Sequence, residues 1–192
     1  MLAVIGRHVR DEFGMTIGLN VLRNDAKSAM GAAVACGASF IRVNVLVGSA
    51  WTDQGLIHSR AASLLRYRRA LCGSAPGPKI FADIHVKHAV AAAGFDIATT
   101  AVEAVERSGA DGVIVTGART GSPASVGDLE AVRRVVPNHP LFVGSGVNPS
   151  TIATVSQLCT GAIVGTAFHR DSNINLPIDE NRVRAMVDET RR

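Results

Sequence analysis

Two short segments that end in glycine and carry hydroxyl groups follow each other along the chain. The first reads Leu-Phe-Val-Gly144-Ser145-Gly146, and the second reads Gly-Ala-Ile-Val-Gly165-Thr166. Glycine lets backbone N–H groups approach an anion closely, and serine and threonine add hydroxyl donors. We therefore predict that all five numbered residues bind a phosphate group. The alternative is that the glycines only allow tight strand-to-helix turns. The sequence contains neither a dinucleotide-binding GxGxxG fingerprint nor a GxxxxGK[ST] phosphate loop.

A second group of candidate residues alternates along one segment, Asp83-Ile-His85-Val-Lys87-His88. In a strand, Asp83, His85 and Lys87 share one face, and titratable groups clustered at a strand end can perform acid–base chemistry. We predict these three as catalytic residues. Two other interpretations stay open: a hydrogen-bond network that only shapes the fold, and metal ligation by Asp83, His85 and His88, whose spacing is not diagnostic. We expect neither a metal ion nor a cofactor.

Polar residues at the ends of other predicted strands form a third group. Asn20 and Asn44 lie within strand-like runs, Asp53 follows the second run, and Thr116 and Gly117 end a later one. Amides, hydroxyls and backbone groups can orient a polar substrate through hydrogen bonds, so we predict these five residues as substrate-binding. The alternative is ordinary capping and turn chemistry.

Short β-type runs alternate with helical stretches along the whole chain, and these elements must position the candidate residues. The strand candidates are 17–22, 40–46, 79–86, 112–117, 141–146 and 162–167. The helix candidates between them are 25–37, 57–71, 97–108, 129–136 and 149–158. Strand, helix and strand at this spacing predict a parallel sheet with crossover helices.

The alternation within the strand candidates favours a closed barrel over an open, doubly wound sheet. Ile80 and Ala82 share one face of their segment, whereas Asp83 and His85 share the other. In an open sheet both faces meet helices, so its strands are apolar throughout. One apolar face for helices and one polar face suit a barrel wall. We predict an α/β fold of the (β/α)8 TIM-barrel type.

The number of strand candidates predicts an incomplete barrel. A complete one needs eight strands and roughly 250 residues, whereas six candidates occur here and the chain opens on a helical pattern. We therefore expect residues 1–192 to form a single partial domain that lacks the first two βα units, with its strands in sequential order and one flank open. The predicted phosphate loops would then follow strands seven and eight, where barrels often bind phosphate. Exposed edges predict poor solubility or a homo-oligomer.

Composition restricts the classes of partner. The chain has 192 residues, 47% of them hydrophobic, and a net charge of +4 with scattered arginines. We expect no nucleic-acid partner. Cys36, Cys72 and Cys159 are odd in number and lack a CxxC pair, which fits a reducing cytosol. No apolar run is long enough for a membrane span and no leader opens the chain, so we predict a cytoplasmic protein with no transmembrane segment; peripheral membrane association stays open.

Several stretches together resemble the BtpA family over the whole chain. They are Gly18-Leu-Asn20-Val-Leu-Arg23-Asn24-Asp25, Phe40-Ile-Arg42-Val-Asn44-Val-Leu, Thr52-Asp53-Gln54-Gly55, Arg66-Tyr67-Arg68, Phe81-Ala-Asp83-Ile-His85-Val-Lys87-His88, Val115-Thr116-Gly117, Val143-Gly144-Ser145-Gly146-Val147 and Ile163-Val164-Gly165-Thr166. The resemblance implies a fold like the ribulose-phosphate-binding barrels, with two further βα units at the start of family members. The family is known for a photosystem I biogenesis protein, and some relatives are likened to sugar or nucleoside metabolism proteins. The resemblance implies no single reaction.

Two functions from different classes follow. The first is a barrel protein that binds or transforms a small phosphorylated metabolite, by chemistry of the lyase, isomerase or hydrolase type. The second is a non-catalytic assembly or stability factor for a protein complex. A polar pocket would favour the first, and an exposed apolar patch would favour the second.

Overall fold

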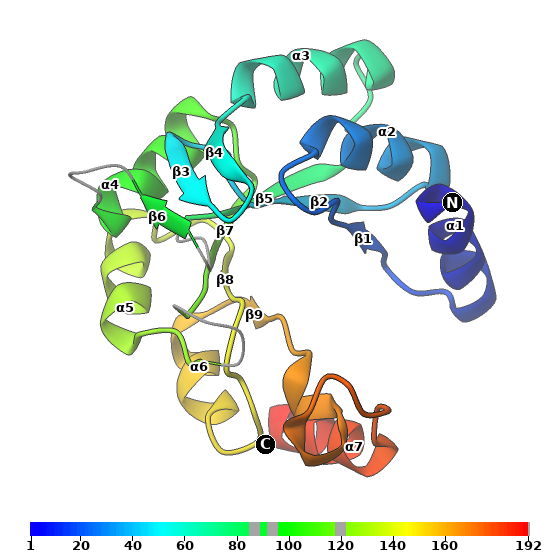
Figure 1. The fold of residues 1–192 in the computed structure, drawn as a ribbon, viewed down its shortest axis with the longest axis vertical. Helices are drawn as coiled ribbons and strands as arrows, with labels where there is room; N and C mark the ends of the chain where they lie inside the picture. The colour runs from blue at the N-terminus through cyan, green and yellow to red at the C-terminus, as the bar shows by residue number, and fades with distance from the viewer. Residues whose placement is uncertain (85–88, 92–95, 118–121, 192) are drawn as a thin grey trace.

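Six parallel strands form one curled sheet whose spatial order is the same as their order in the chain (Figure 1). The computed structural model describes residues 1–84, 89–91, 96–117 and 122–191. The strands are β1 (Gly18–Leu19), β2 (Phe40–Val43), β5 (Lys79–Asp83), β7 (Gly112–Val115), β8 (Leu141–Val143) and β9 (Gly161–Ala162). Every neighbouring pair is parallel. The predicted sequential sheet, curved into an incomplete barrel, is confirmed.

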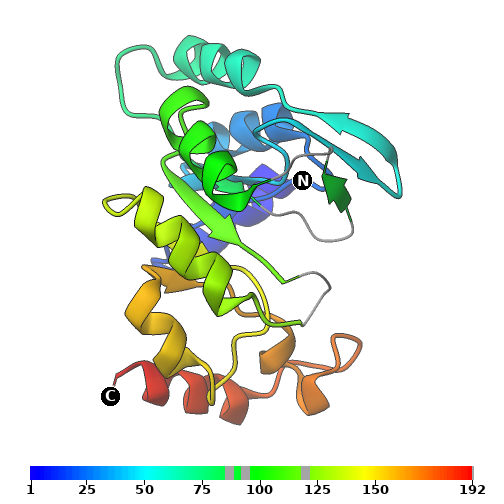
Figure 2. The ribbon, with the colours of Figure 1, turned by 90° about the vertical axis from the view of Figure 1, so that its left-hand side faces the viewer.

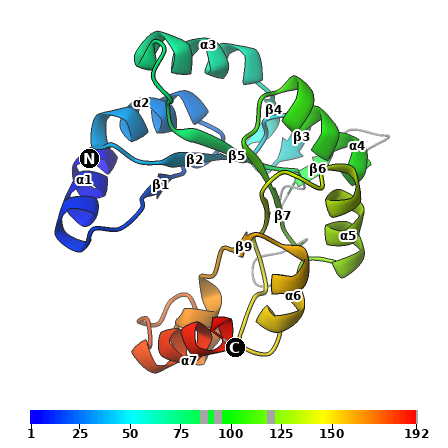
Figure 3. The same cartoon turned by 180° about the vertical axis from the view of Figure 1, so that it is seen from behind.

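Helices cover the convex side of this sheet, and the concave side faces the open flank (Figures 1 and 3). The helices are α1 (Leu2–Phe13), α2 (Ala26–Cys36), α3 (Ala61–Cys72), α4 (Ile97–Val102), α5 (Val126–Val135), α6 (Ile152–Leu158) and α7 (Glu180–Thr190). A π-helical turn, η1 (Glu103–Arg107), continues α4. The Asp25 carboxylate caps α2 by accepting the Ser28 N–H at 3.0 Å, which satisfies one of the free donors of the first turn.

The two faces of the strands differ as the alternation predicts. On the convex face Ile41, Ile80 and Val113 are fully buried against the helices. On the concave face the rings of Phe40, Phe81 and Phe142 form a row, with centroids 4.9 Å and 4.8 Å apart. Glycines stand beside these rings on neighbouring strands: a Cβ at Gly18 would overlap the Phe40 ring, and Cβ atoms at Gly112 and Gly161 would each lie 3.1 Å from one. Large and small residues thus alternate across the interior layer.

The observed strands end two to five residues before the predicted ones. Residues 44–46 and 163–165 follow β2 and β9 without continuing the ladder, and a 3-10 turn, η2 (Thr166–Phe168), replaces the end of the predicted strand 162–167. Segments that leave the carboxyl edge of a barrel keep an apolar pattern because they stay buried, although they no longer pair. Val45 and Leu46, for example, are only 3% and 1% exposed.

A small antiparallel sheet follows β2 and was not predicted. It consists of β3 (Ser49–Thr52), β4 (Gly55–His58) and β6 (Ala89–Ala91), in the order β4-β3-β6. Figure 2 shows the β3–β4 hairpin extending away from the main sheet. The predicted helix 57–71 was therefore wrong at its start, because Ile57 and His58 pair with Ala50 and Ser49.

Candidate functional site

The two glycine-ended loops lie on one cleft of about 270 Å³ beyond the carboxyl ends of β8 and β9. Residues 144–148 and 163–167 line it, together with Arg42 and Ser172. The curvature of the sheet brings Arg42 on β2 to these loops, although two strands, β5 and β7, separate β2 from β8 in the sheet. The loops therefore meet as the sequence predicts; that they bind phosphate stays a prediction.

Ser145 places a buried hydroxyl on this cleft. The residue is 5% exposed, and its Oγ makes no hydrogen bond with any residue in the described part of the chain. A buried hydroxyl that lacks a partner costs about 1–3 kcal/mol, so such groups are uncommon unless a water or ligand completes them.

The glycines of the first loop serve packing as well as access. The N–H of Gly144 already donates to Val115 O at 2.8 Å, so it is not free for an anion. A Cβ at Gly144 would lie 2.8 Å from the methyl groups of Ile114 and Thr116. Gly146 has φ +68°, and a Cβ there would overlap the backbone of Pro123. These positions need glycine for steric reasons, whatever the cleft binds.

Gly165 differs from the glycines of the first loop. A Cβ at Gly165 would meet no atom within 4 Å, and its φ of −131° is open to any residue. Packing therefore does not require glycine at this position. A larger side chain there would enter the cleft without displacing its neighbours, which makes Gly165 the position best suited to test the site. Thr166, also on the cleft, begins the η2 turn.

Asp83 lies at the centre of a hydrogen-bond network on the concave face. Its Oδ1 and Oδ2 accept from Nε and Nη2 of Arg42, both at 2.9 Å, and Oδ2 also accepts from Asn44 Nδ2 at 2.8 Å. Asn20 Nδ2 donates to Asn44 Oδ1 at 3.3 Å and to Arg42 O at 2.9 Å. The Asp83 side chain is 2% exposed and that of Arg42 is 22% exposed. Three of the predicted site residues, Asp83, Asn44 and Asn20, thus meet in one network with Arg42.

The other two predicted catalytic residues, His85 and Lys87, lie outside the described residues, as does His88. The acid–base role of the trio stays a prediction. The contacts of Asp83 are those of the internal hydrogen-bond network that the sequence left open as an alternative.

The remaining predicted substrate residues stand apart from this network. Asp53 lies at the turn of the β3–β4 hairpin and pairs with Arg23, with 2.5 Å between Oδ1 and Nη1. Thr116 is buried, at 2% exposure. A Cβ at Gly117 would overlap the carbonyl oxygen of Ser122. Gly117 therefore allows a close backbone approach, and its substrate role stays a prediction.

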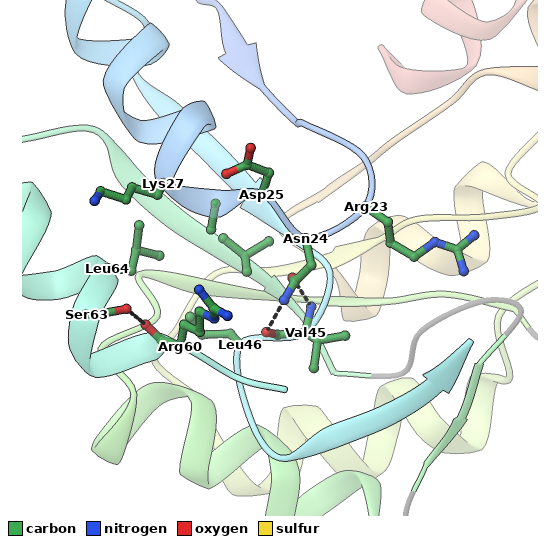
Figure 4. A pocket seen from close by; sticks show the side chains of 11 residues that line it. Arg23, Asn24, Asp25, Lys27, Val45, Leu46, Arg60, Ser63 and Leu64 are labelled. Carbon is green, nitrogen blue, oxygen red and sulfur yellow. Dashed lines mark hydrogen bonds between the residues drawn. The ribbon is translucent and has the colours of Figure 1, made fainter. Parts of the chain in front are cut away.

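A second cleft, of about 290 Å³, lies on the helix side of β2 (Figure 4). Its lining includes Val43 and Val45, which alternate with the inward-facing Arg42 and Asn44. Asn24 holds its edge, because its Oδ1 accepts from Val45 N at 2.7 Å and its Nδ2 donates to Val45 O at 3.0 Å. Asn24 thus serves the local architecture here, outside the barrel interior.

Sequence reasoning placed Arg42 in no ligand site. The available signal was the alternation itself, which sets an arginine two residues before Asn44 on the polar face of a buried strand. Among the described residues, no three His, Cys, Asp or Glu side chains gather in a way that could hold a metal ion. None of the described helices is long and apolar enough to cross a membrane.

The chain has relatives and structural neighbours among known proteins. It is 44% identical over 172 residues to the photosystem I biogenesis protein BtpA of Synechocystis sp., which covers 90% of this chain and 59% of that protein. It is 43% identical over 184 residues to an uncharacterized protein of Pyrococcus furiosus, covering 96% of this chain and 68% of the relative. The chain therefore spans 59% and 68% of the lengths of these two relatives.

The fold resembles that of solved barrel enzymes. N-(5'-phosphoribosyl)anthranilate isomerase from Pyrococcus furiosus superposes with a TM-score of 0.63 at 14% identity, over 98% of this chain and 80% of that one. At this identity the likeness shows the fold alone, that of a barrel of alternating strands and helices. The family model described as the BtpA family matches residues 1–192. The chain belongs to the BtpA family.

Proposed function

We propose that this protein binds a small phosphorylated metabolite, with the phosphate group in the cleft between residues 144–148 and 163–167. The carrying observation is the Ser145 hydroxyl, which lines this cleft, is buried, and has no hydrogen-bond partner among the described residues. A phosphate oxygen is a strong acceptor and would satisfy it.

The chemistry of the rest of the lining supports an anionic ligand. The N–H groups of Gly146 and Gly165 donate to no residue in the described ranges, and Thr166 adds a second hydroxyl. The lining contains one arginine and no aspartate or glutamate. Backbone N–H groups, hydroxyls and a guanidinium together form a typical set of phosphate donors.

Likeness of fold is consistent with this proposal. The isomerase named above acts, by its name, on a phosphoribosyl compound, and its chain folds as this one does. Fold alone does not determine function, so the proposal depends on the cleft. Asp83, His85 and Lys87 remain the candidates for any acid–base step on the bound metabolite, and a lyase, isomerase or hydrolase reaction is the class we propose for it.

A second candidate function comes from the Synechocystis relative, whose name assigns it to photosystem I biogenesis. A non-catalytic assembly or stability factor is therefore the alternative we carry forward. The Pyrococcus furiosus relative is almost equally similar, at 43% identity, and its name assigns no such role.

We further propose that the protein works in the cytoplasm. All three cysteines, Cys36, Cys72 and Cys159, are free thiols. Unpaired cysteines are typical of a reducing compartment.

The test compares two glycine-to-leucine variants. Inorganic phosphate and a panel of sugar phosphates, sugar-acid phosphates and nucleoside phosphates are titrated into wild type, Gly165→Leu and Gly127→Leu, with binding followed by calorimetry and turnover by phosphorus NMR. Gly127 is the matched control, since it is exposed on α5 and a Cβ there meets only the Ser125 Oγ, at 3.6 Å.

We expect wild type and Gly127→Leu to bind phosphate and at least one phosphate ester, and Gly165→Leu to lose both with its fold unchanged. If wild type binds no phosphate and no ester, the metabolite proposal is wrong and the assembly-factor alternative is favoured. Equal affinity of Gly165→Leu and wild type would remove this cleft as the site.

A further inference from the structure

We infer that Arg42 is the cationic ligand of the phosphate in this cleft, and that Asp83, with Asn44 and Asn20, is a positioning group for Arg42. The inference rests on the proposed function and assigns its charged group. It changes the role predicted for Asp83, from an acid or base to the support of a binding residue.

Arg42 has donors to spare after pairing with Asp83. A guanidinium carries five N–H groups, and Asp83 takes one from Nε and one from Nη2, both at 2.9 Å. Nη1 donates to no residue in the described part of the chain. Since Arg42 also lines the cleft that Gly146 and Gly165 line, the edge of the guanidinium not used by Asp83 is the one available to a ligand.

Asp83 is committed to this support. Its side chain is 2% exposed, and within the described part of the chain its two oxygens accept two hydrogen bonds from Arg42 and one from Asn44. A carboxylate that removes a proton from a substrate must reach that proton within hydrogen-bonding distance. The observed contacts instead direct both oxygens of Asp83 toward Arg42 and Asn44.

The network closes on itself and spans three adjacent strands. Asn20, directly after β1, donates to the Asn44 amide oxygen at 3.3 Å and to the backbone carbonyl of Arg42 at 2.9 Å, so residues on or directly after β1, β2 and β5 all fix the position of the guanidinium. A bidentate contact fixes orientation as well as distance, and connected polar groups lock one another's rotamers. The result is a guanidinium held at one orientation at the mouth of the cleft.

This arrangement points to a phosphate ester, or to another oxyanion that offers two acceptor oxygens side by side. A planar fork of donors matches such a group, whereas an ammonium offers a point charge only. Arg42→Lys therefore keeps the charge but cannot hold Asp83 through two bonds and the ligand through others.

The experiment titrates inorganic phosphate into wild type, Arg42→Lys, Asp83→Asn and Gly165→Leu. Arg42→Met alone removes the two guanidinium hydrogen bonds of the buried Asp83 carboxylate and is expected to destabilise the fold. The double variant Arg42→Met/Asp83→Leu removes both partners, so no buried carboxylate is left behind, and it tests the loss of Arg42 in a folded protein. The Nε–H resonance of Arg42 in proton–nitrogen spectra reports its orientation directly.

We expect at least a tenfold loss of phosphate affinity in Arg42→Lys and in the double variant. We expect a smaller loss of phosphate affinity in Asp83→Asn, together with faster exchange of the Arg42 Nε–H proton with water, because that N–H loses its carboxylate acceptor. A purely structural role of Asp83 would lower thermal stability and leave the phosphate affinity of the folded protein unchanged.

The outcomes separate this inference from the proposed function. Loss of phosphate binding in Gly165→Leu with wild-type affinity in both Arg42 variants overturns the inference and leaves the proposed function standing. No phosphate binding by wild type overturns both. Wild-type phosphate affinity in Asp83→Asn, together with abolished turnover of a metabolite found in the screen, returns Asp83 to an acid–base role.

Discussion

Arg42 and Asp83 connect β2 to β5 through two parallel hydrogen bonds of 2.9 Å on the concave face of the half-barrel. Phe81 is the backbone partner of Arg42 in the ladder, so the ion pair reaches diagonally to the residue two positions further on. The pair stands one layer above the row of Phe40, Phe81 and Phe142, between the apolar floor of the interior and its polar rim. The same arginine therefore both joins two strands of the sheet and lines the cleft.

Removing one partner of this pair should destabilise the fold more than removing both. In Arg42→Met, the buried Asp83 carboxylate loses both hydrogen bonds from the guanidinium, so we expect the free energy of unfolding in urea to fall by about 3 kcal/mol or somewhat less, because Arg42 is partly exposed. The double variant Arg42→Met/Asp83→Leu should lose less of the free energy of unfolding than Arg42→Met does.

The matched control for that series is Arg184→Met. Arg184 pairs with Glu180 on α7, and both side chains are more than two-thirds exposed. Exposed pairs contribute less than about 1 kcal/mol, so this variant should unfold at nearly the wild-type urea concentration. A double variant less stable than Arg42→Met would contradict the view of Asp83 as a buried charge in need of a partner.

Gly117 should not tolerate a side chain. A Cβ there would overlap the carbonyl oxygens of Ser122 and Pro123, which are backbone atoms and cannot rotate away. Gly117→Ala should therefore lower the free energy of unfolding by about 2–3 kcal/mol. Gly127→Ala, on the exposed face of α5, should be neutral or stabilising by up to about 1 kcal/mol. Equal urea midpoints for the two variants would remove the close-approach role of Gly117.

The sequence predicted the parts of the fold that depend on local pattern. Strand alternation set Ile80 and Ala82 outward and Asp83 inward, and both apolar residues are fully buried. The order of the strands followed from the short connections. The two glycine-ended loops meet because consecutive parallel strands end at the same edge of a sheet.

The parts that were not predicted depend on geometry at longer range. The pattern at Val45 and Leu46 continues beyond β2 because these residues remain buried, and no local signal marks where pairing stops. The hairpin at Ser49–His58 was missed because residues 47–56 carry polar, loop-like residues, and Ile57 and His58 were assigned to the helix that follows. Arg42 reaches the cleft only through the curvature of the sheet, which sequence spacing does not encode.

The Asp25 cap of α2 should contribute less to the stability of the fold as the pH falls. Hydrogen bonds from the side chain and the backbone N–H of Ser28 hold the pKa of Asp25 below its ordinary value of 3.8. A carboxyl with a lowered pKa in the folded state stabilises the fold above that ordinary value, and this contribution is lost as the pH falls through the folded pKa.

The free energy of unfolding of Asp25→Ala should therefore be about 1 kcal/mol lower than that of wild type at pH 7, which is the usual effect of losing an N-cap. This difference in free energy should become smaller below pH 4. Asp25→Asn is the control, since its amide caps the helix without titrating. Urea unfolding at pH 7, 5 and 3 measures all three proteins. A gap between wild type and Asp25→Ala that stays constant down to pH 3 would contradict the role of the ionised cap.

Ser145→Ala should affect stability and ligand affinity in opposite directions. The Ser145 Oγ is buried without a hydrogen-bond partner among the described residues, so removing it relieves an unsatisfied polar group, and we expect the free energy of unfolding to rise by up to about 1 kcal/mol without ligand. The same hydroxyl is proposed to donate to phosphate. A hydrogen bond to a charged group contributes about 1.5–3 kcal/mol, so phosphate affinity should fall roughly tenfold or more.

Ser156→Ala is the control, because the Ser156 hydroxyl is exposed on α6 and donates to Ala153 O at 2.9 Å, away from the cleft. Urea unfolding and phosphate calorimetry on the three proteins give both quantities. A destabilised Ser145→Ala with unchanged phosphate affinity would mean that the hydroxyl serves the fold and not the ligand.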